Sequence, residues 1–160
     1  SAQKAQRYKG KTGREASLTT SCNRRALVVD DDAFNQNLMK EYLKKLNCEV
    51  DIASNGLEGL ELYKKDPWRY RFITMDIQMP VMDGITAVKE IRKFGETRKI
   101  KAIPIVFITA NCSSDKDPQE TFGLQDIGNT FYFPKPFRFL DCKSFVDKIL
   151  TPTDDVLIVD

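Results

Sequence analysis

The 160-residue sequence contains no histidine, and this absence excludes several kinds of chemistry. Catalytic triads and dyads that use histidine as the base are excluded, and so is a phosphohistidine formed within this chain. A histidine that donates a phosphoryl group must come from another protein or another part of a longer chain. The cysteines form no CxxC pair, which, without histidine, argues against a zinc site. They are Cys22, Cys48, Cys112 and Cys142.

Long apolar stretches are also missing. No apolar run approaches the roughly 20 residues that a membrane-spanning helix needs. The first residues lack the apolar region of a secretory signal. These absences predict a chain that does not insert into a membrane and that works, with free thiols, in a reducing cytoplasm.

Positive charge is concentrated at the start of the chain. Residues 1–25 hold seven Lys or Arg and one acid, a net charge of +6; the whole chain is +2, so the rest carries −4. A basic segment can bind nucleic acid or an anionic surface, but this one has no apolar stripe and Tyr8 is its single aromatic. We interpret residues 1–24 as a flexible basic linker that binds no nucleic acid, residues 25–150 as one domain, and residues 151–160 as a tail.

Short apolar runs alternate with amphipathic segments through the predicted domain. The short runs predict strands at residues 26–30, 50–53, 72–76, 103–109 and 131–133. The segments between them predict helices at residues 35–46, 55–66, 85–94 and 137–150, with a short helix around 119–124. Gly95 is expected to cap the third of these helices. Five alternations of strand and helix predict an α/β fold, a doubly wound five-stranded parallel sheet with helices on both faces.

Charged and polar residues follow the predicted strands at the edge where such sheets bind ligands. Asp30 and Asp31 follow the first strand, Asp76 ends the third, Thr109 ends the fourth and Lys135 follows the fifth. Crowded carboxylates repel one another unless a cation neutralises them, and Mg²⁺ prefers oxygen ligands completed by a phosphate. With a hydroxyl and an ammonium group for the phosphate, this set predicts phosphoryl transfer to a carboxylate.

Each of these residues also has an ordinary structural role open to it. An Asp after a strand commonly caps the next helix, which is the role expected of Asp32, and Lys-Pro is common loop sequence. The functional interpretation rests on several such residues meeting at one edge of the sheet.

Four sequence blocks resemble the signatures of the response-regulator receiver domain family. The blocks are Val28–Asp31, Met75–Gly84, Ile108–Ala110 and Lys135–Phe137, and the resemblance covers roughly residues 25–150. The sequence of the second block is most similar to that of receivers attached to hybrid histidine kinases. The resemblance implies a flavodoxin-like (βα)₅ fold in a two-component or phosphorelay system.

The resemblance also implies a role for individual residues. Asp76 would be the phosphoacceptor. Asp31, Asp76 and the backbone carbonyl of Gln78 would hold Mg²⁺, with Asp30 helping through water. Thr109 would bind a phosphoryl oxygen, Lys135 would bridge the acceptor carboxylate and the phosphate, and Tyr132 would be the aromatic switch residue. The Lys135–Pro136 bond is expected to be cis. The implied partner is a histidine kinase or a histidine phosphotransfer protein. The domain would catalyse its own phosphorylation and dephosphorylation. If the chain is part of a hybrid histidine kinase, its parent would be a membrane-anchored kinase with this part in the cytosol.

Some features depart from the family and leave other functions open. The stretch between Thr109 and Lys135 is longer than usual, and Pro134 stands where an apolar strand residue is typical. One alternative is a vestigial receiver that serves only as an interaction module. Another is a phosphatase of the haloacid dehalogenase type, but that class needs a second Asp two residues after the nucleophile, where this chain has Gln78.

Overall fold

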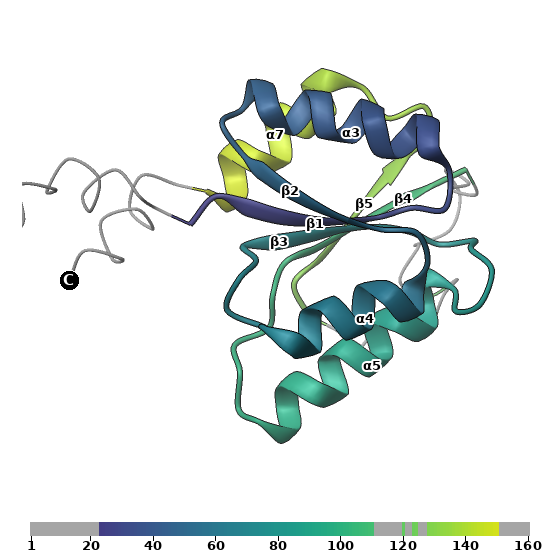
Figure 1. Cartoon of the computed structure of the whole chain (residues 1–160), viewed down its shortest axis with the longest axis vertical. Helices are drawn as coiled ribbons and strands as arrows, with labels where there is room; N and C mark the ends of the chain where they lie inside the picture. Colours follow the sequence, from purple (N-terminus) through teal and green to yellow (C-terminus); the bar gives the residue numbers. More distant parts are fainter. Residues whose placement is uncertain (1–22, 111–119, 121–122, 125–127, 151–160) are drawn as a thin grey trace, which may run out of the picture.

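The computed structural model describes residues 23–110, 120, 123–124 and 128–150. These residues form one parallel sheet with helices on both faces (Figure 1), which confirms the predicted fold class. Residues 1–22 of the predicted linker, the predicted tail and most of the short helix around residues 119–124 lie outside the described residues. Asn23, at the end of the predicted linker, is described and donates hydrogen bonds to the carbonyls of Trp68 and Arg69. Among the described helices, none has the length and apolar composition needed to cross a membrane.

The sheet contains five parallel strands in the order β2-β1-β3-β4-β5. Their bounds are β1 Arg25–Val29, β2 Glu49–Ala53, β3 Phe72–Asp76, β4 Ile105–Thr109 and β5 Thr130–Pro134. The winding direction reverses between β1 and β3, so the carboxyl ends of these two strands border the crevice where ligands bind in such folds. In the register, Asp76 lies beside Ile108, and Thr109 lies beside Pro134.

Four described helices cover the two faces of the sheet. They are α3 Ala33–Lys45, α4 Gly56–Lys65, α5 Gly84–Thr97 and α7 Phe139–Ile149. Helices α3 and α7 pack on one face, and α4 and α5 on the other (Figure 1). Asp32 caps α3 by accepting a hydrogen bond from the Phe34 amide at 2.8 Å, which confirms its predicted role. Asn55 and Asp83 cap α4 and α5 in the same way.

The third strand carries buried side chains toward both faces of the sheet. Phe72 belongs to the core under α3 and α7, whereas Ile73 and Met75 belong to the core under α4 and α5. All five residues of β3 are buried, because helices cover a central parallel strand on both sides. Burying a large apolar side chain contributes roughly 1.5–3 kcal/mol. This packing fixes the position of Asp76 at the end of the strand.

The predicted end of the third helix at Gly95 is wrong. Helix α5 continues to Thr97, and Arg98 is its C-cap. The amide of Lys99 donates to the carbonyl of Glu96, and the amide of Ile100 donates to the carbonyl of Gly95, with Lys99 in the left-handed region at φ 56°. This is a Schellman ending, so a lysine takes the conformation that the prediction assigned to glycine.

The fourth strand starts two residues later than predicted, at Ile105. Proline at position 104 has no amide hydrogen to donate to the sheet. Its carbonyl still accepts a hydrogen bond from Ile73 at 3.0 Å. The strand therefore begins directly after the proline.

Candidate functional site

The carboxyl ends of the strands bring the predicted site residues to one edge of the sheet. A cavity of about 260 Å³ opens there, and its polar lining includes most of the predicted site. The lining residues are Asp31, Asp32, Asn35, Asp76, Gln78, Thr109, Ala110 and Lys135. Asp30 lies behind them and lines a neighbouring, mainly apolar cavity together with Asp76 and Lys135. Residues at or just after the carboxyl ends of β1, β3, β4 and β5 thus meet as the sheet topology predicts.

Three carboxylates lie close enough to bind one cation. Asp30, Asp31 and Asp76 each offer one oxygen, and these oxygens all lie within 4.8 Å of one another. Asp30 and Asp76 are buried, whereas Asp31 is exposed, so the cluster is partly open to water. A set of oxygen donors with access to water suits Mg²⁺, which keeps several of its own waters. The residues present therefore fit the metal that the sequence predicts.

Lys135 and Asp76 form the charged centre of the site. The Lys135 ammonium Nζ lies 3.3 Å from Oδ1 of Asp76. The same oxygen accepts a hydrogen bond from the Ile77 amide at 2.8 Å. Both of these hydrogen bonds to the Asp76 carboxylate fall on Oδ1. The other carboxylate oxygen, Oδ2, is left to interact with a ligand.

The site holds more negative charge than its own residues compensate. Burial raises the pKa of Asp76, and the nearby Lys135 and the Ile77 amide only partly oppose this shift. Burial also raises the pKa of Asp30; the charge of Asp76 adds to the rise, while the Asp32 amide opposes it. A raised pKa means that the ionised form is disfavoured in the folded protein. A cation bound among these carboxylates would remove that penalty.

The segments around Thr109 and Lys135 are connected through the backbone. Thr109 is buried at the end of β4, and its carbonyl accepts a hydrogen bond from the Lys135 amide at 2.9 Å. The peptide bond between Lys135 and Pro136 is cis, as the resemblance implies. The hydroxyl-bearing residue and the ammonium-bearing residue are thus held next to each other.

Tyr132 lies away from the carboxylates, on the face of the sheet that α4 and α5 cover. It is half-buried in β5, and its ring stacks on Phe107 with centroids 5.3 Å apart. Gln78 lines the cavity and has an exposed side chain. The switch role of Tyr132 and the metal-binding role of the Gln78 carbonyl stay predictions.

Two supporting contacts of the site were not predicted. The Gln36 side-chain amide donates to the Asp30 carbonyl at 2.6 Å, and the Gly56 amide donates to the carbonyl of Met82 at 3.0 Å. The sequence offered a partial signal, because Gly56 follows a helix-capping Asn and Gln36 lies in the first turn after the acidic run. Neither pattern indicates the distant partner.

The five-stranded parallel fold and the acidic site at the carboxyl ends of its strands are those expected of a receiver domain. Comparisons with known proteins agree with this class. The model of the response regulator receiver domain family matches residues 26–147. The chain therefore belongs to the response regulator receiver domain family, which functions in two-component and phosphorelay signalling.

Similar proteins include receivers within larger kinases. The chain is 37% identical over 134 residues to hybrid signal transduction histidine kinase G of Dictyostelium discoideum; the match covers 82% of this chain but 4% of that kinase. A solved receiver domain of a Pseudomonas aeruginosa sensor histidine kinase, with magnesium in its active-site cleft, is 28% identical with a TM-score of 0.66, covering 79% of this chain and 97% of the other.

A third similar structure contains a phosphorelay complex. In this Saccharomyces cerevisiae structure, the receiver domain of the response regulator Ssk1 is bound to the histidine phosphotransfer protein Ypd1. The similarity amounts to 27% identity and a TM-score of 0.66, covering 82% of this chain and 95% of the other. Relatives of this chain thus include a receiver that binds a phosphotransfer protein.

Proposed function

We propose that this receiver accepts a phosphoryl group on Asp76 from a phosphohistidine of another protein or domain, in a reaction that requires Mg²⁺. One observation carries the proposal: three carboxylate oxygens lie within 4.8 Å of one another, and a lysine ammonium lies 3.3 Å from the central carboxylate. This combination supplies ligands for a hard cation and a positive charge for a phosphate.

The metal-binding groups come from two segments of the chain. Asp31, Asp76 and the Gln78 backbone carbonyl would hold Mg²⁺, with Asp30 contributing through water. When bound, Mg²⁺ neutralises the negative charge of the phosphoryl oxygens and orients them. The raised pKa of Asp76, caused mainly by burial, supports the need for such a cation.

The chain's own residues then carry the transfer. An oxygen of Asp76 attacks the phosphorus in line; the new O–P bond forms as the N–P bond of the phosphohistidine breaks, and the bond's electron pair leaves with the imidazole nitrogen. Oδ2 is the preferred oxygen, because Ile77 and Lys135 already engage Oδ1. Lys135 compensates the charge that gathers between carboxylate and phosphate, and the Thr109 hydroxyl binds a phosphoryl oxygen.

The signalling output would begin at Thr109. A phosphoryl group on Asp76 adds negative charge next to it, and movement of Thr109 toward that group alters the end of β4. Tyr132 lies on the neighbouring strand, stacked on Phe107 of β4, so it is placed to respond. This is a two-state element biased by a local change of charge.

The donor is proposed to be a histidine kinase or a histidine phosphotransfer protein. The likeness to hybrid histidine kinases and to a receiver bound to Ypd1 supports this partner, and it also supports a parent chain that is itself a hybrid kinase. The proposed setting is the cytoplasm, which agrees with the buried thiol of Cys142, a cysteine that forms no disulfide. Nucleic acid and direct membrane insertion are not part of the proposal.

The proposal is tested with a small-molecule phosphoryl donor. Wild-type protein and the Asp76→Asn variant are incubated with acetyl phosphate and Mg²⁺, and intact-protein mass spectrometry measures the added phosphoryl group. We expect phosphorylation of the wild type that EDTA abolishes, and none of the variant. Equal phosphorylation of the variant would refute the assignment of Asp76. A vestigial receiver would gain no phosphoryl group, and a phosphatase would instead turn over phosphomonoesters steadily.

A further inference from the structure

The loop from β3 to α5, residues 77–83, is called the acceptor loop here because it follows Asp76 and carries Gln78. Its two ends are fixed by backbone hydrogen bonds. The Gly84 amide donates to the Ile77 carbonyl at 2.8 Å, which closes the loop at its base. The Gly56 amide, at the start of α4, donates to the Met82 carbonyl at 3.0 Å. A different segment of the chain therefore supports the far end of the loop.

Gly56 leaves no room between helix α4 and the acceptor loop. A Cβ atom added at Gly56 would lie 2.4 Å from the carbonyl oxygen of Met82 and 2.9 Å from that of Asp83. Real Cβ contacts are essentially never shorter than 3.0 Å, so the Met82 oxygen would have to retreat by at least about 0.6 Å. These are backbone atoms, which cannot rotate away as a side chain does. Any side chain at this position therefore displaces the loop.

The start of α4 is itself rigidly held. The Asn55 side chain accepts a hydrogen bond from the Glu58 amide at 2.9 Å, and the Glu58 carboxylate accepts one from the Ser54 amide at 2.6 Å. Glu58, in the first turn, is thereby hydrogen-bonded to both residues that precede the helix, Ser54 and the N-cap Asn55. The helix end is thus a firm support, so strain at Gly56 falls on the acceptor loop.

The same junction is linked to the acidic end of β1. The Gln36 side-chain amide contacts the Ser54 hydroxyl at 3.3 Å and the Asp30 carbonyl at 2.6 Å. In addition, the Asp30 amide donates to the Ala53 carbonyl at 3.1 Å. The segment before α4 therefore contacts both parts of the proposed metal site, the end of β1 and the acceptor loop.

We propose that Gly56 is a positioning residue of the phosphoacceptor site: its missing side chain sets how closely the acceptor loop approaches the acids after β1. It touches neither metal nor phosphate, and it acts through the carbonyl of Met82. The proposal rests on the proposed function and deepens it, because the loop carries the Gln78 carbonyl. Supporting contacts of this kind typically change metal affinity by roughly 10- to 100-fold when they are disturbed.

The test compares three glycine-to-alanine substitutions in the full chain. Gly56→Ala pushes on the loop backbone. Gly59→Ala, in the same helix, brings a Cβ to 2.8 Å from a methyl group of Val29, in the core. Gly95→Ala makes only ordinary contacts, the nearest at 3.7 Å. Mg²⁺ affinity is measured from amide chemical shifts, and the free energy of unfolding from urea titration.

We expect Gly56→Ala to weaken Mg²⁺ binding by roughly 10-fold or more, with metal-free amide shifts changed mainly in residues 77–84. Gly59→Ala should lose stability and keep its Mg²⁺ affinity within about twofold, because its clash spares the loop backbone. Gly95→Ala should match the wild type in Mg²⁺ affinity and be at least as stable, because alanine favours the helix more than glycine does. Unchanged Mg²⁺ affinity in Gly56→Ala, or an equal loss in Gly59→Ala, would overturn the positioning role.

A measurement on the unmodified protein covers the case in which Gly56→Ala fails to fold. The Gly56 amide resonance should shift when Mg²⁺ binds, because its hydrogen-bond acceptor belongs to the acceptor loop. A Gly56 resonance that stays fixed while those of residues 77–84 move would refute the coupling. Absence of any Mg²⁺ binding by the wild type would instead refute the proposed function, so the two failures are distinguishable.

Discussion

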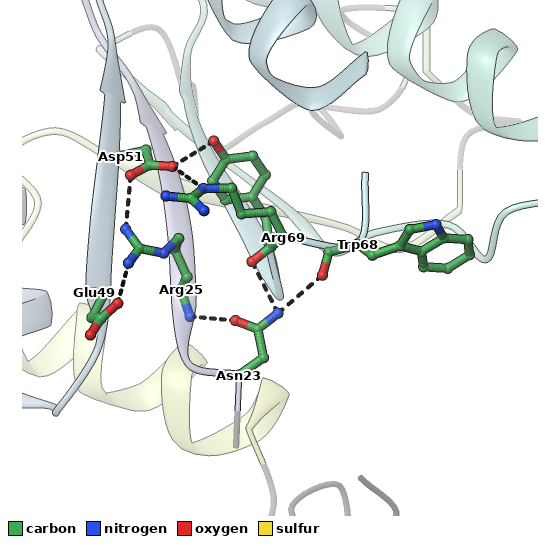
Figure 2. A network of polar contacts seen from close by, with 7 residues as sticks. Asn23, Arg25, Glu49, Asp51, Trp68 and Arg69 are labelled. Carbon is green, nitrogen blue, oxygen red and sulfur yellow. Dashed lines mark hydrogen bonds and ion pairs between the residues drawn. The ribbon is translucent and has the colours of Figure 1, made fainter. Parts of the chain in front are cut away.

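The two edges of the sheet carry buried or half-buried aspartates in opposite electrostatic states. Near the amino ends of the strands, Asp51 accepts hydrogen bonds from Arg25 at 2.8 Å and from Arg69 and Tyr70 at 2.7 Å each. Figure 2 shows this network, which Glu49 and Asn23 extend. At the carboxyl ends, the acids are close to one another, and Lys135 is the lysine among the described residues that line the cavity there.

The pKa shifts follow this difference. Burial alone would raise the pKa of Asp51, but hydrogen bonds from Arg69 and Tyr70 and the charge of Arg25 lower it below its ordinary value. The pKa values of Asp30 and Asp76 are raised, chiefly by burial. The chain compensates Asp51 with its own groups, and this edge stabilises the fold. At the opposite edge Asp30, Asp31 and Asp76 lie close together beside Lys135, and the negative charge there is compensated less completely.

The largest effect on stability is expected at the edge that holds Asp51, called the compensated edge here because neighbouring side chains of the protein compensate the Asp51 charge. Asp51→Ala leaves the polar groups of Arg25, Arg69 and Tyr70 without their acceptor, which should lower the free energy of unfolding by about 3 kcal/mol. Urea denaturation measures this loss. Mg²⁺ affinity should stay unchanged, because the site lies at the other edge. A loss below about 0.5 kcal/mol would show that the network contributes little.

Alkaline pH should weaken the same network. The pKa of Tyr70 is raised to about 12, by burial first and then by its hydrogen bond to Asp51. The folded protein therefore holds this proton longer than the unfolded chain, whose tyrosines titrate near 10. Stability should fall as the pH rises from about 10 to 12, by roughly 2 kcal/mol. The Tyr70→Phe variant should lack this component of the pH dependence, and an identical decline in the variant would contradict the assignment.

Metal binding should stabilise the protein through the acidic edge. At a Mg²⁺ concentration tenfold above its Kd, the stabilisation should be about 1.4 kcal/mol. Thermal or urea unfolding with and without Mg²⁺ measures it, with Ca²⁺-free buffer and constant ionic strength as controls. The gain should persist in Asp51→Asn but be much reduced in Asp31→Asn. An equal gain in both variants would point to nonspecific ion effects.

The smallest expected effect is a gain in stability on mutation, where most substitutions cause a loss. Without Mg²⁺, Asp76→Asn should raise the free energy of unfolding slightly near neutral pH, because it removes a buried charge whose pKa is raised. The ionised Asp76 carboxylate therefore lowers the stability of the fold as the pH rises from the ordinary pKa of 3.8 through the raised pKa. At lower pH the carboxylate is protonated and this loss of stability is absent. Destabilisation by Asp76→Asn would mean that Lys135 overcompensates the carboxylate.

The acidic edge could be predicted from the sequence, but the compensated edge could not. Strand periodicity predicts which residues end the strands, and parallel pairing brings those ends together, so Asp30, Asp76 and Thr109 were placed correctly. The partners of Asp51 are 18 to 26 residues away in sequence, and no periodic pattern indicates such pairs. The contact of Gly56 with Met82 depends likewise on how α4 packs against the acceptor loop.

Local conformation also limited the prediction of the helix ends. Gly95 is the residue type that usually ends a helix, yet the left-handed residue is Lys99. Glycine only permits that conformation, and the two backbone hydrogen bonds that follow Thr97 select the position. Hydrogen bonds of this kind depend on packing that sequence patterns do not show.

The most direct test of the contrast between the edges is a Mg²⁺ titration of the full chain followed by amide chemical shifts. We predict saturable shifts at residues 30–32, at residues 77–84 and at Lys135, while Asp51 and Tyr70 stay unchanged. The same titration of Asp76→Asn should show weaker binding at the same residues. Shifts of similar size at both edges, or no saturable shift at the acidic edge, would contradict the central claim that the chain leaves this edge for a cation to complete.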